Sequence, residues 1–352
     1  MQRLDIDTVA DLLDGHVDLR RRPDAVQPLR YAFGDNLFLD PFTRWAASCA
    51  AGVRLRLTSD TRSLRLAATQ RSFGDRADTY ELYVDGKLYE RQRATGGARL
   101  ADGKLVGDER ASVSFEALPA GEKRLELWLP QTATVSITSL EIDDGAVVAP
   151  WPDARPTVLF HGSSISHCME ADGGSATWPA VAAAAGDLRS INMGWAGSCL
   201  LSGLAARAIR DQAADGIVLK LGINVHGGGA LNERTFLDSA HAMISIIREK
   251  HAATPLIIVS PIWSPPREDA GEGGGLSLKA MRKRLEDVVE ARRRAGDGHI
   301  SYLSGLSLFG EADAPDLPDQ LHPNAVGYRR MGERFHAQVL ADGRWLGGET
   351  LG

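Results

Sequence analysis

Ser164 is the first residue of this 352-residue chain whose type and setting could do chemistry. It lies in HGSSIS (161–166), which directly follows the apolar run TVLF (157–160). A serine at a strand-to-helix turn exposes its hydroxyl and places backbone N–H groups beside a developing oxyanion. The position therefore predicts a nucleophile, although serine and glycine are also ordinary turn residues.

Asp319 and His322 form a second candidate pair in DQLHPN (319–324). The two residues are three positions apart in a tight turn. The carboxylate can therefore accept a hydrogen bond from one imidazole nitrogen, which leaves the other nitrogen free to act as a base. Pro323 suits the first turn of a helix, which would put the pair at the start of that helix. A capping aspartate beside an unrelated histidine is the alternative.

Gly197 and Asn224 could bind an oxyanion. Gly197 belongs to GWAGS (194–198), whose small residues let backbone approach a ligand closely. Asn224 ends LGIN (221–224), and its amide could donate to an oxyanion or only cap the next turn. Each of the four segments that carry Ser164, Gly197, Asn224 and the Asp319–His322 pair has a structural explanation when taken alone. Together the four supply a nucleophile, a base, an orienting carboxylate and oxyanion donors.

A parallel sheet is expected to position these residues. Short apolar runs alternate with helical patterns, which predicts strands covered by helices on both faces. The predicted strands are TVLF, SINM, GIVLKL, PLIIVS and ISYL, and the predicted helices span 202–213, 232–251, 276–295 and 323–341. Sites in such sheets lie beyond the carboxyl ends of the strands, where the candidates fall.

The N-terminal half has a different period. From about Pro28 to Asp143 apolar and polar residues alternate in short runs separated by turn signals, which is typical of an antiparallel sandwich. The runs are VRLRLTS, LRLAATQ, YELYVDG, ASVSFEAL, KRLELWLP and TVSITSLEID. A short helix is expected within the first twenty or so residues. We predict a β-sandwich domain over 1–145, a proline-containing linker over 146–156, and a catalytic domain over 157–345.

Composition excludes several classes of protein. With 43% hydrophobic and 24% charged residues the chain is globular, and its net charge of −6 with scattered Lys and Arg argues against nucleic acid as a partner. We expect no membrane association and a cytoplasmic location, since neither a signal peptide nor a long apolar span is visible. Three widely spaced cysteines indicate buried thiols rather than disulfides. We expect neither a metal nor a cofactor.

The C-terminal part resembles the SGNH hydrolases, also called GDSL esterases and lipases. GSSIS, GWAG, LGIN and DQLHPN are similar to the four blocks of that family and occur in its order. The N-terminal sandwich, with YELYVDG, resembles the branch that includes the salicylyl acyltransferase of tetracycline biosynthesis. The resemblance implies a three-layer αβα domain with a flavodoxin-like parallel sheet, preceded by a jelly-roll-like antiparallel β-sandwich.

The resemblance also assigns roles. It implies that Ser164 is the nucleophile, His322 the base and Asp319 its orienting carboxylate, with Ser164 N–H, Gly197 N–H and the Asn224 side chain as the oxyanion hole. Ser163 and Val225 stand where the family usually has aspartates, which puts in doubt the hydrogen bonding around the turn.

Three functions are compatible with these residues. We expect an esterase that forms an acyl-enzyme on a small-molecule ester or acyl donor. The alternatives are an acyltransferase of secondary metabolism, which passes the acyl group to an alcohol, and a catalytically inactive binding protein. The sandwich could be a spacer, a pocket wall, a carbohydrate contact or an oligomer contact.

Overall fold

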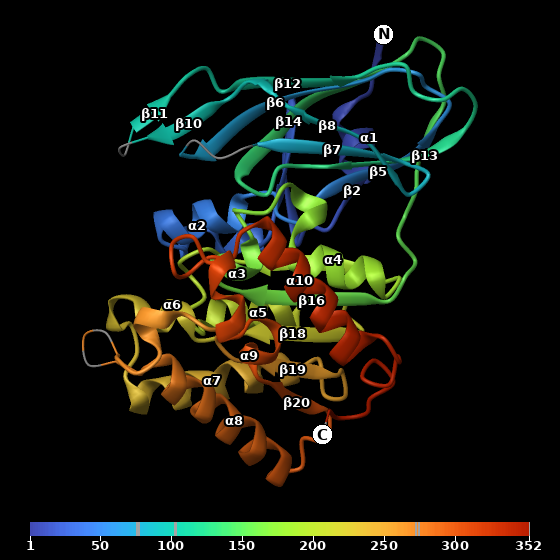
Figure 1. Ribbon diagram of the computed structural model, residues 1–352. Coiled ribbons are helices and arrows are strands. Elements are labelled where there is room, and N and C mark those ends of the chain that lie inside the picture. The colour runs from blue at the N-terminus through green and yellow to red at the C-terminus, as the bar shows by residue number, and fades with distance from the viewer. Residues whose placement is uncertain (75–77, 102–103, 272, 274, 352) are drawn as a thin grey trace. The chain divides into compact units, whose positions relative to one another are not determined.

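The computed structural model describes residues 1–74, 78–101, 104–271, 273 and 275–351 (Figure 1). The chain forms two compact units. Unit 1 comprises Met1–Ala154 and Asp172–Ser175, and unit 2 comprises Arg155–Ala171 and Ala176–Gly352. The segment Asp172–Ser175 lies inside the predicted catalytic domain in sequence, yet it groups with the first unit in space.

Unit 1 contains two β-sheets. The larger has the strand order β11-β10-β6-β14-β4-β3, with β1, β12 and β9 paired beside it, and the smaller has the order β15-β5-β13-β7-β8, with β2 paired to β5. The pairings between described strands are antiparallel except for that of β10 with β6. The larger sheet consists of β1 (Gln2–Arg3), β3 (Asp18–Arg22), β4 (Ala25–Leu29), β6 (Leu64–Phe73), β9 (Thr95–Gly96), β10 (Ala98–Ala101), β11 (Lys104–Val106), β12 (Arg110–Phe115) and β14 (Ala133–Ile142). The smaller consists of β2 (Leu13–Asp14), β5 (Arg54–Ser59), β7 (Thr79–Val84), β8 (Lys87–Arg93), β13 (Lys123–Trp128) and β15 (Val148–Pro150).

Alternation along these strands builds the core of unit 1. In β14, Val135 and Ile137 are buried in the core, while Thr134, Ser136 and Thr138, which alternate with them, point to the other face. Since successive side chains of a strand point to opposite faces, each sheet contributes one apolar face to a shared core. The helical segments of this unit are α1 (Ile6–Asp11), η1 (Phe33–Leu37) and α2 (Pro41–Ser48).

Unit 2 contains a five-stranded parallel sheet in the order β17-β16-β18-β19-β20. Its strands are β16 (Thr157–Gly162), β17 (Arg189–Gly194), β18 (Gly216–Lys220), β19 (Leu256–Val259) and β20 (Ile300–Leu303). The order 2-1-3-4-5 is that of flavodoxin-like sheets. All residues of β16 and β18 are buried, as expected for strands covered on both faces.

Helices flank this parallel sheet. Helix α4 packs against α10, and α7 packs against both α5 and α8 (Figure 1). Phe160 of β16 contacts Trp178 and Phe335 on the α4 and α10 side. The helices are α3 (Ser164–His167), α4 (Trp178–Ala185), α5 (Gly203–Arg210), α6 (Ile223–His226), α7 (Glu233–Arg248), α8 (Leu278–Arg294), α9 (Gly305–Leu308) and α10 (Ala325–Phe335). Shorter 3₁₀ turns are η2 (Gly174–Ala176), η3 (Gly227–Gly229), η4 (Pro265–Arg267) and η5 (Glu311–Asp316), and a π-helical segment, His336–Leu340, extends α10.

The structure confirms the predicted fold class, an antiparallel sandwich followed by a three-layer αβα unit. Several details differ from the prediction: the β3–β4 hairpin was not expected, strand β15 lies within the predicted linker, and two helices of unit 2 differ. The last helix begins at Ala325, with Asn324 as its N-cap, so Pro323 precedes the helix rather than forming its first turn. Helix α4 was not predicted, because its sequence WPAVAAAA is apolar throughout and lacks the helical periodicity.

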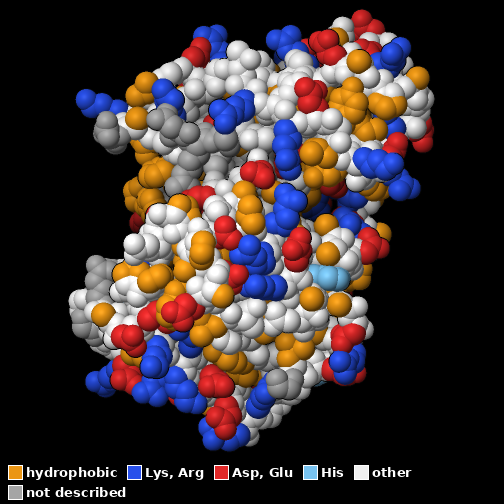
Figure 2. Space-filling view, in the orientation of Figure 1, with side chains coloured by type: hydrophobic (Ala, Val, Ile, Leu, Met, Phe, Trp, Pro, Cys, Tyr) orange, Lys and Arg blue, Asp and Glu red, His pale blue; other side chains and the backbone are white. Residues whose placement is uncertain are grey.

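The surface carries both signs of charge. Figure 2 shows Lys and Arg side chains interspersed with Asp and Glu over the visible face of the molecule. In the described part of the chain, no helix is both long enough and apolar enough to cross a membrane.

Candidate active site

Ser164 is the first residue of helix α3, directly beyond the carboxyl end of strand β16. Ser163 is the N-cap of this helix, and its Oγ accepts a hydrogen bond from the Ile165 N–H at 3.2 Å. Serine and aspartate are both good N-caps. Ser163, where the family usually has aspartate, therefore retains a capping hydrogen bond at the turn.

The turn is packed closely against the next strand. A Cβ atom on Gly194, the last residue of β17, would lie 2.3 Å from the His167 nitrogen, so only glycine fits here. Asn192 of the same strand donates from Nδ2 to the Ser166 carbonyl at 2.8 Å and accepts from the Gly194 N–H at 2.8 Å. These contacts fix α3, and with it Ser164, relative to the sheet.

His322 links Ser164 to Asp319. Its Nε2 lies 2.8 Å from the Ser164 Oγ, and its Nδ1 lies 2.6 Å from the Asp319 Oδ2. An ionised carboxylate only accepts hydrogen bonds, so Nδ1 carries the proton and Nε2 is left to accept from the serine hydroxyl. The structure thus brings these three predicted residues into one hydrogen-bonded chain.

The Asp319 carboxylate is held in its ionised form. Its Oδ1 accepts from the backbone N–H groups of His322 at 2.7 Å and Leu321 at 3.0 Å. Burial raises the pKa of Asp319, but the hydrogen bonds from the His322 backbone and ring outweigh it and keep that pKa below its ordinary value. The carboxylate therefore stays charged at neutral pH, as an acceptor of the Nδ1 proton must.

Gln320, between these two residues, adopts a left-handed backbone conformation, with φ of +62°. Its carbonyl accepts hydrogen bonds from the Ser264 Oγ at 2.7 Å and from the Arg267 Nη1 at 3.3 Å. Ser264 lies in the loop after β19, where its N–H donates to Glu268 at 3.0 Å. Glu268 forms a buried ion pair with Arg282 of α8. These contacts hold the turn at Gln320, and no pattern in the sequence indicates them.

Asn224 and Gly197 lie at neighbouring strand ends. Gly197 follows β17, and Asn224 lies in α6 beyond β18, the strands on either side of β16. The Asn224 Oδ1 accepts the Cys199 N–H at 3.0 Å, which ties the two segments together. Within the described residues, the N–H groups of Ser164 and Gly197 and the Asn224 Nδ2 have no acceptor. All three are available to donate.

The backbone before Asn224 has a special shape. Gly222 has φ of +117°, and a Cβ atom there would lie 2.7 Å from the Pro261 Cγ. Val225, where the family usually has aspartate, is fully buried, and its N–H donates to the Gly222 carbonyl at 2.9 Å. An apolar residue suits this position, because the side chain is buried in the core.

Buried groups surround the strand ends. His161 is fully buried and hydrogen-bonds through Nδ1 to the Met193 carbonyl at 2.8 Å. Burial raises the pKa of the Cys199 thiol to about 12 and lowers that of Lys220 to about 8. The cysteines are all buried, as predicted, and Cys199 is a thiol and not a nucleophilic thiolate at neutral pH. Among the described residues, no group of His, Cys, Asp and Glu could hold a metal ion.

Comparison with known proteins supports the fold and the family. Residues 160–330 match the GDSL-like Lipase/Acylhydrolase family. No curated protein matches the sequence. The salicylyl-acyltransferase SsfX3 from a tetracycline biosynthetic pathway is 27% identical, with a TM-score of 0.82 over 92% of each chain.

Two further structures share the fold at lower identity. A putative GDSL-like lipase from Bacteroides ovatus ATCC 8483 is 16% identical, with a TM-score of 0.75 over 98% of each chain. The acetyl xylan esterase Est2A from the rumen bacterium Butyrivibrio proteoclasticus is 12% identical, with a TM-score of 0.61 over 98% of this chain and 99% of its own.

The family match spans the strands and turns that carry Ser164, Gly197, Asn224, Asp319 and His322, and the likeness to the acyltransferase extends over both units. Over residues 160–330 the chain matches the GDSL/SGNH hydrolase family, whose enzymes act on ester bonds.

Proposed function

We propose that this chain is a serine-dependent esterase that acts on a small-molecule ester through an acyl-enzyme. One observation carries the proposal: the Ser164 Oγ, the His322 ring and the Asp319 carboxylate are joined by hydrogen bonds of 2.8 and 2.6 Å. A nucleophile in contact with a base that a third group orients is the arrangement required for nucleophilic catalysis.

The reaction has two halves. The Ser164 Oγ attacks the ester carbonyl as His322 Nε2 takes its proton, and Asp319 stabilises the imidazolium that forms. The Ser164 and Gly197 N–H groups and the Asn224 amide donate to the oxyanion of the tetrahedral intermediate. His322 then gives its proton to the leaving alkoxide, and the same steps with water as nucleophile release the acid.

An acyltransferase is the second candidate function. The acyl-enzyme can be resolved by an alcohol in place of water, with no change in the roles of Ser164 and His322. The likeness to a salicylyl-acyltransferase over 92% of both chains favours this candidate. The two functions differ only in the nucleophile of the second half-reaction.

Hydrolysis of short-chain p-nitrophenyl esters by wild type and Ser164→Ala tests the nucleophile. We expect Ser164→Ala to lower kcat by about 10⁴-fold or more, since the hydroxyl is the attacking group. Ser166→Ala is the matched control, because the Ser166 Oγ is buried two residues away and has no hydrogen-bond partner among the described residues. Intact-mass spectrometry should detect an acyl adduct in the wild type and none in Ser164→Ala.

The same assay separates the two functions. Adding an alcohol acceptor diverts product from free acid to new ester in an acyltransferase, whereas an esterase continues to release mainly acid. Equal activity of Ser164→Ala and wild type would disprove the proposed mechanism.

A further inference from the structure

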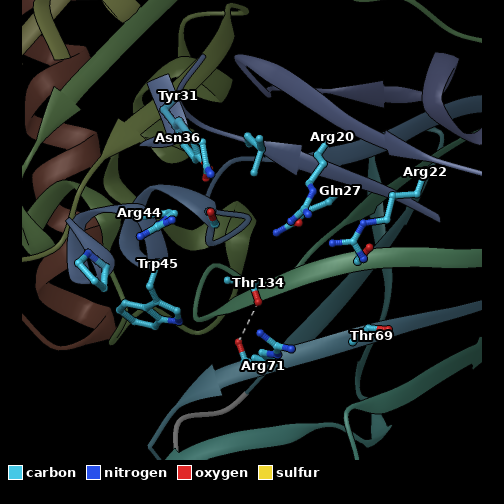
Figure 3. Close-up of a pocket in the computed structure, with 14 residues that line it drawn as sticks. Arg20, Arg22, Gln27, Tyr31, Asn36, Arg44, Trp45, Thr69, Arg71 and Thr134 are labelled. Carbon is cyan, nitrogen blue, oxygen red and sulfur yellow. Dashed lines mark hydrogen bonds between the residues drawn. The ribbon is translucent and has the colours of Figure 1, made fainter. Parts of the chain in front are cut away.

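A cavity of about 290 Å³ lies on one face of the larger sheet of unit 1. Strands β3, β4, β6 and β14, which are neighbours in that sheet, form its floor, and α2 and η1 form its walls (Figure 3). On β6, Thr69 and Arg71 line the cavity, whereas Leu66 and Ala68, at the alternate positions of the same strand, belong to the core. Because side chains alternate along a strand, the cavity lies on the face that points away from the core.

Four arginines line this cavity: Arg20 and Arg22 from β3, Arg44 from α2, and Arg71 from β6 (Figure 3). No aspartate or glutamate is among the described residues that line it. This local excess of positive charge contrasts with the net charge of −6 for the whole chain.

Two of the arginines have neither an acidic nor an aromatic partner among the described residues. Arg71 pairs with Glu109 at 3.0 Å, and Arg20 lies 5.6 Å from the centre of the Phe33 ring. In the part of the chain that the structure describes, Arg22 and Arg44 form neither an ion pair nor a ring contact. Their guanidinium groups therefore retain their donors for an external acceptor.

The remaining lining residues suit a ligand that has both polar and apolar parts. Trp45 is half-buried beside Arg44 on α2 and presents an apolar wall. Gln27 contributes a side-chain amide from the floor, directly opposite Arg20 in the β3–β4 pair. Guanidinium groups bind the oxygens of phosphates and carboxylates in a planar, two-pronged geometry. A concave surface of one charge sign also concentrates ions of the opposite sign.

We propose that this cavity binds a small organic polyanion, whose phosphate or carboxylate groups are held by Arg22 and Arg44 and whose apolar part lies against Trp45. Both kinds of acidic group offer the oxygens that the arginines recognise. The inference concerns unit 1 alone and does not depend on the proposed esterase activity.

Isothermal titration calorimetry on the full chain tests this site by measuring the binding of inorganic pyrophosphate in one experiment and of citrate in another. We expect at least one of them to bind with a dissociation constant that rises with salt. The double variant Arg22→Gln/Arg44→Gln should weaken that binding by about tenfold for each arginine removed, since charge-assisted hydrogen bonds are lost. Neither substitution removes an ion pair within the described residues, so the fold should persist.

Arg65→Gln is the matched control. Arg65 is an exposed arginine on the same strand β6, but it does not line the cavity. Binding of pyrophosphate alone supports a phosphate-bearing ligand, and binding of citrate alone supports a polycarboxylate. The proposal fails if neither anion binds the wild type, if the double variant binds as tightly as the wild type, or if Arg65→Gln loses as much affinity as the double variant.

Discussion

Asn224 offers an acceptor and a donor to different partners. Its Oδ1 accepts the Cys199 N–H at 3.0 Å, while its Nδ2 has no acceptor among the described residues. If the Nδ2 donates to the oxyanion, Asn224→Ala should lower kcat by roughly 10²–10³-fold with little change in KM, which corresponds to about 2.7–4 kcal/mol of transition-state stabilisation. Steady-state kinetics on p-nitrophenyl esters measures both constants.

Asn224→Asp distinguishes this role from a structural one. Aspartate retains an oxygen that can accept from the Cys199 N–H, but it has no N–H to donate and brings negative charge toward the oxyanion. We therefore expect Asn224→Asp to be at least as impaired as Asn224→Ala. If Asn224→Asp kept near-wild-type kcat, the residue would serve only to hold the segment around Cys199.

At the scale of elements, the loop after β19 supports the turn that carries Asp319 and His322. The Ser264 Oγ donates to the Gln320 carbonyl. Ser264 is itself held by Glu268, which accepts its N–H and forms an ion pair with Arg282. Since small displacements of reacting groups are costly, Ser264→Ala should lower kcat by roughly threefold to thirtyfold while KM changes little. Loss of one buried hydrogen bond should destabilise the fold by only about 1 kcal/mol.

Asn232→Ala provides a control with a similar loss of stability. Asn232 caps helix α7 by accepting from the Arg234 and Thr235 N–H groups, and removal of such a cap costs about 1 kcal/mol. It has no hydrogen bond to the Ser164–His322–Asp319 chain. Equal kcat in Ser264→Ala and Asn232→Ala, at equal stability, would show that Ser264 does not position the turn.

The sequence predicts the elements and turns of this site because each leaves a local pattern. Apolar runs with abrupt ends mark β16 and β18, and the residues that follow them, Ser164 and Asn224, then fall at one edge of the sheet. The predicted Asp319–His322 pair likewise depends on a spacing within one turn. The geometry that joins Ser164 to His322 is tertiary, and the sequence could only suggest it.

Other features could not be predicted, because they depend on contacts between distant residues. Ser264 and Gln320 are 56 positions apart, and nothing in either local sequence indicates their hydrogen bond. The arginine cavity is assembled from β3, α2 and β6, and the β3–β4 hairpin itself was missed, since RRR and Pro28 do not show an alternating apolar pattern. Only the strand order brings these arginines to one face.

At the scale of the whole molecule, the chain passes through unit 1 twice. After α3 it enters unit 1 at Asp172–Ser175, and it returns to unit 2 before α4. Glu81 of β7, fully buried, accepts the Ser175 N–H at 2.8 Å and pairs with Arg91 at 2.7 Å. A Cβ atom on Gly173 would lie 2.3 Å from the Glu81 carboxyl carbon, so the segment is packed tightly onto this side chain.

Glu81→Gln should therefore affect both units. The amide has one acceptor oxygen where the carboxylate has two, so it cannot accept hydrogen bonds from both the Ser175 N–H and Arg91 as the carboxylate does. The free energy of unfolding should therefore fall by about 1–2 kcal/mol. The segment begins five residues after α3 ends at His167, so loosening it should also reduce kcat, by roughly threefold to tenfold. Thermal unfolding and steady-state kinetics on the same preparation measure the two effects.

Glu109→Gln separates the two contributions, because Glu109 also pairs with an arginine of unit 1, Arg71, but lies in a stretch of chain remote from α3. We expect this control to change neither kcat nor the unfolding temperature appreciably, since partly exposed ion pairs contribute little. If Glu81→Gln lowers the unfolding temperature but leaves kcat at the wild-type value, contacts within unit 2 alone fix α3. A fall in kcat would instead make the anchored segment a route by which unit 1 influences the position of Ser164.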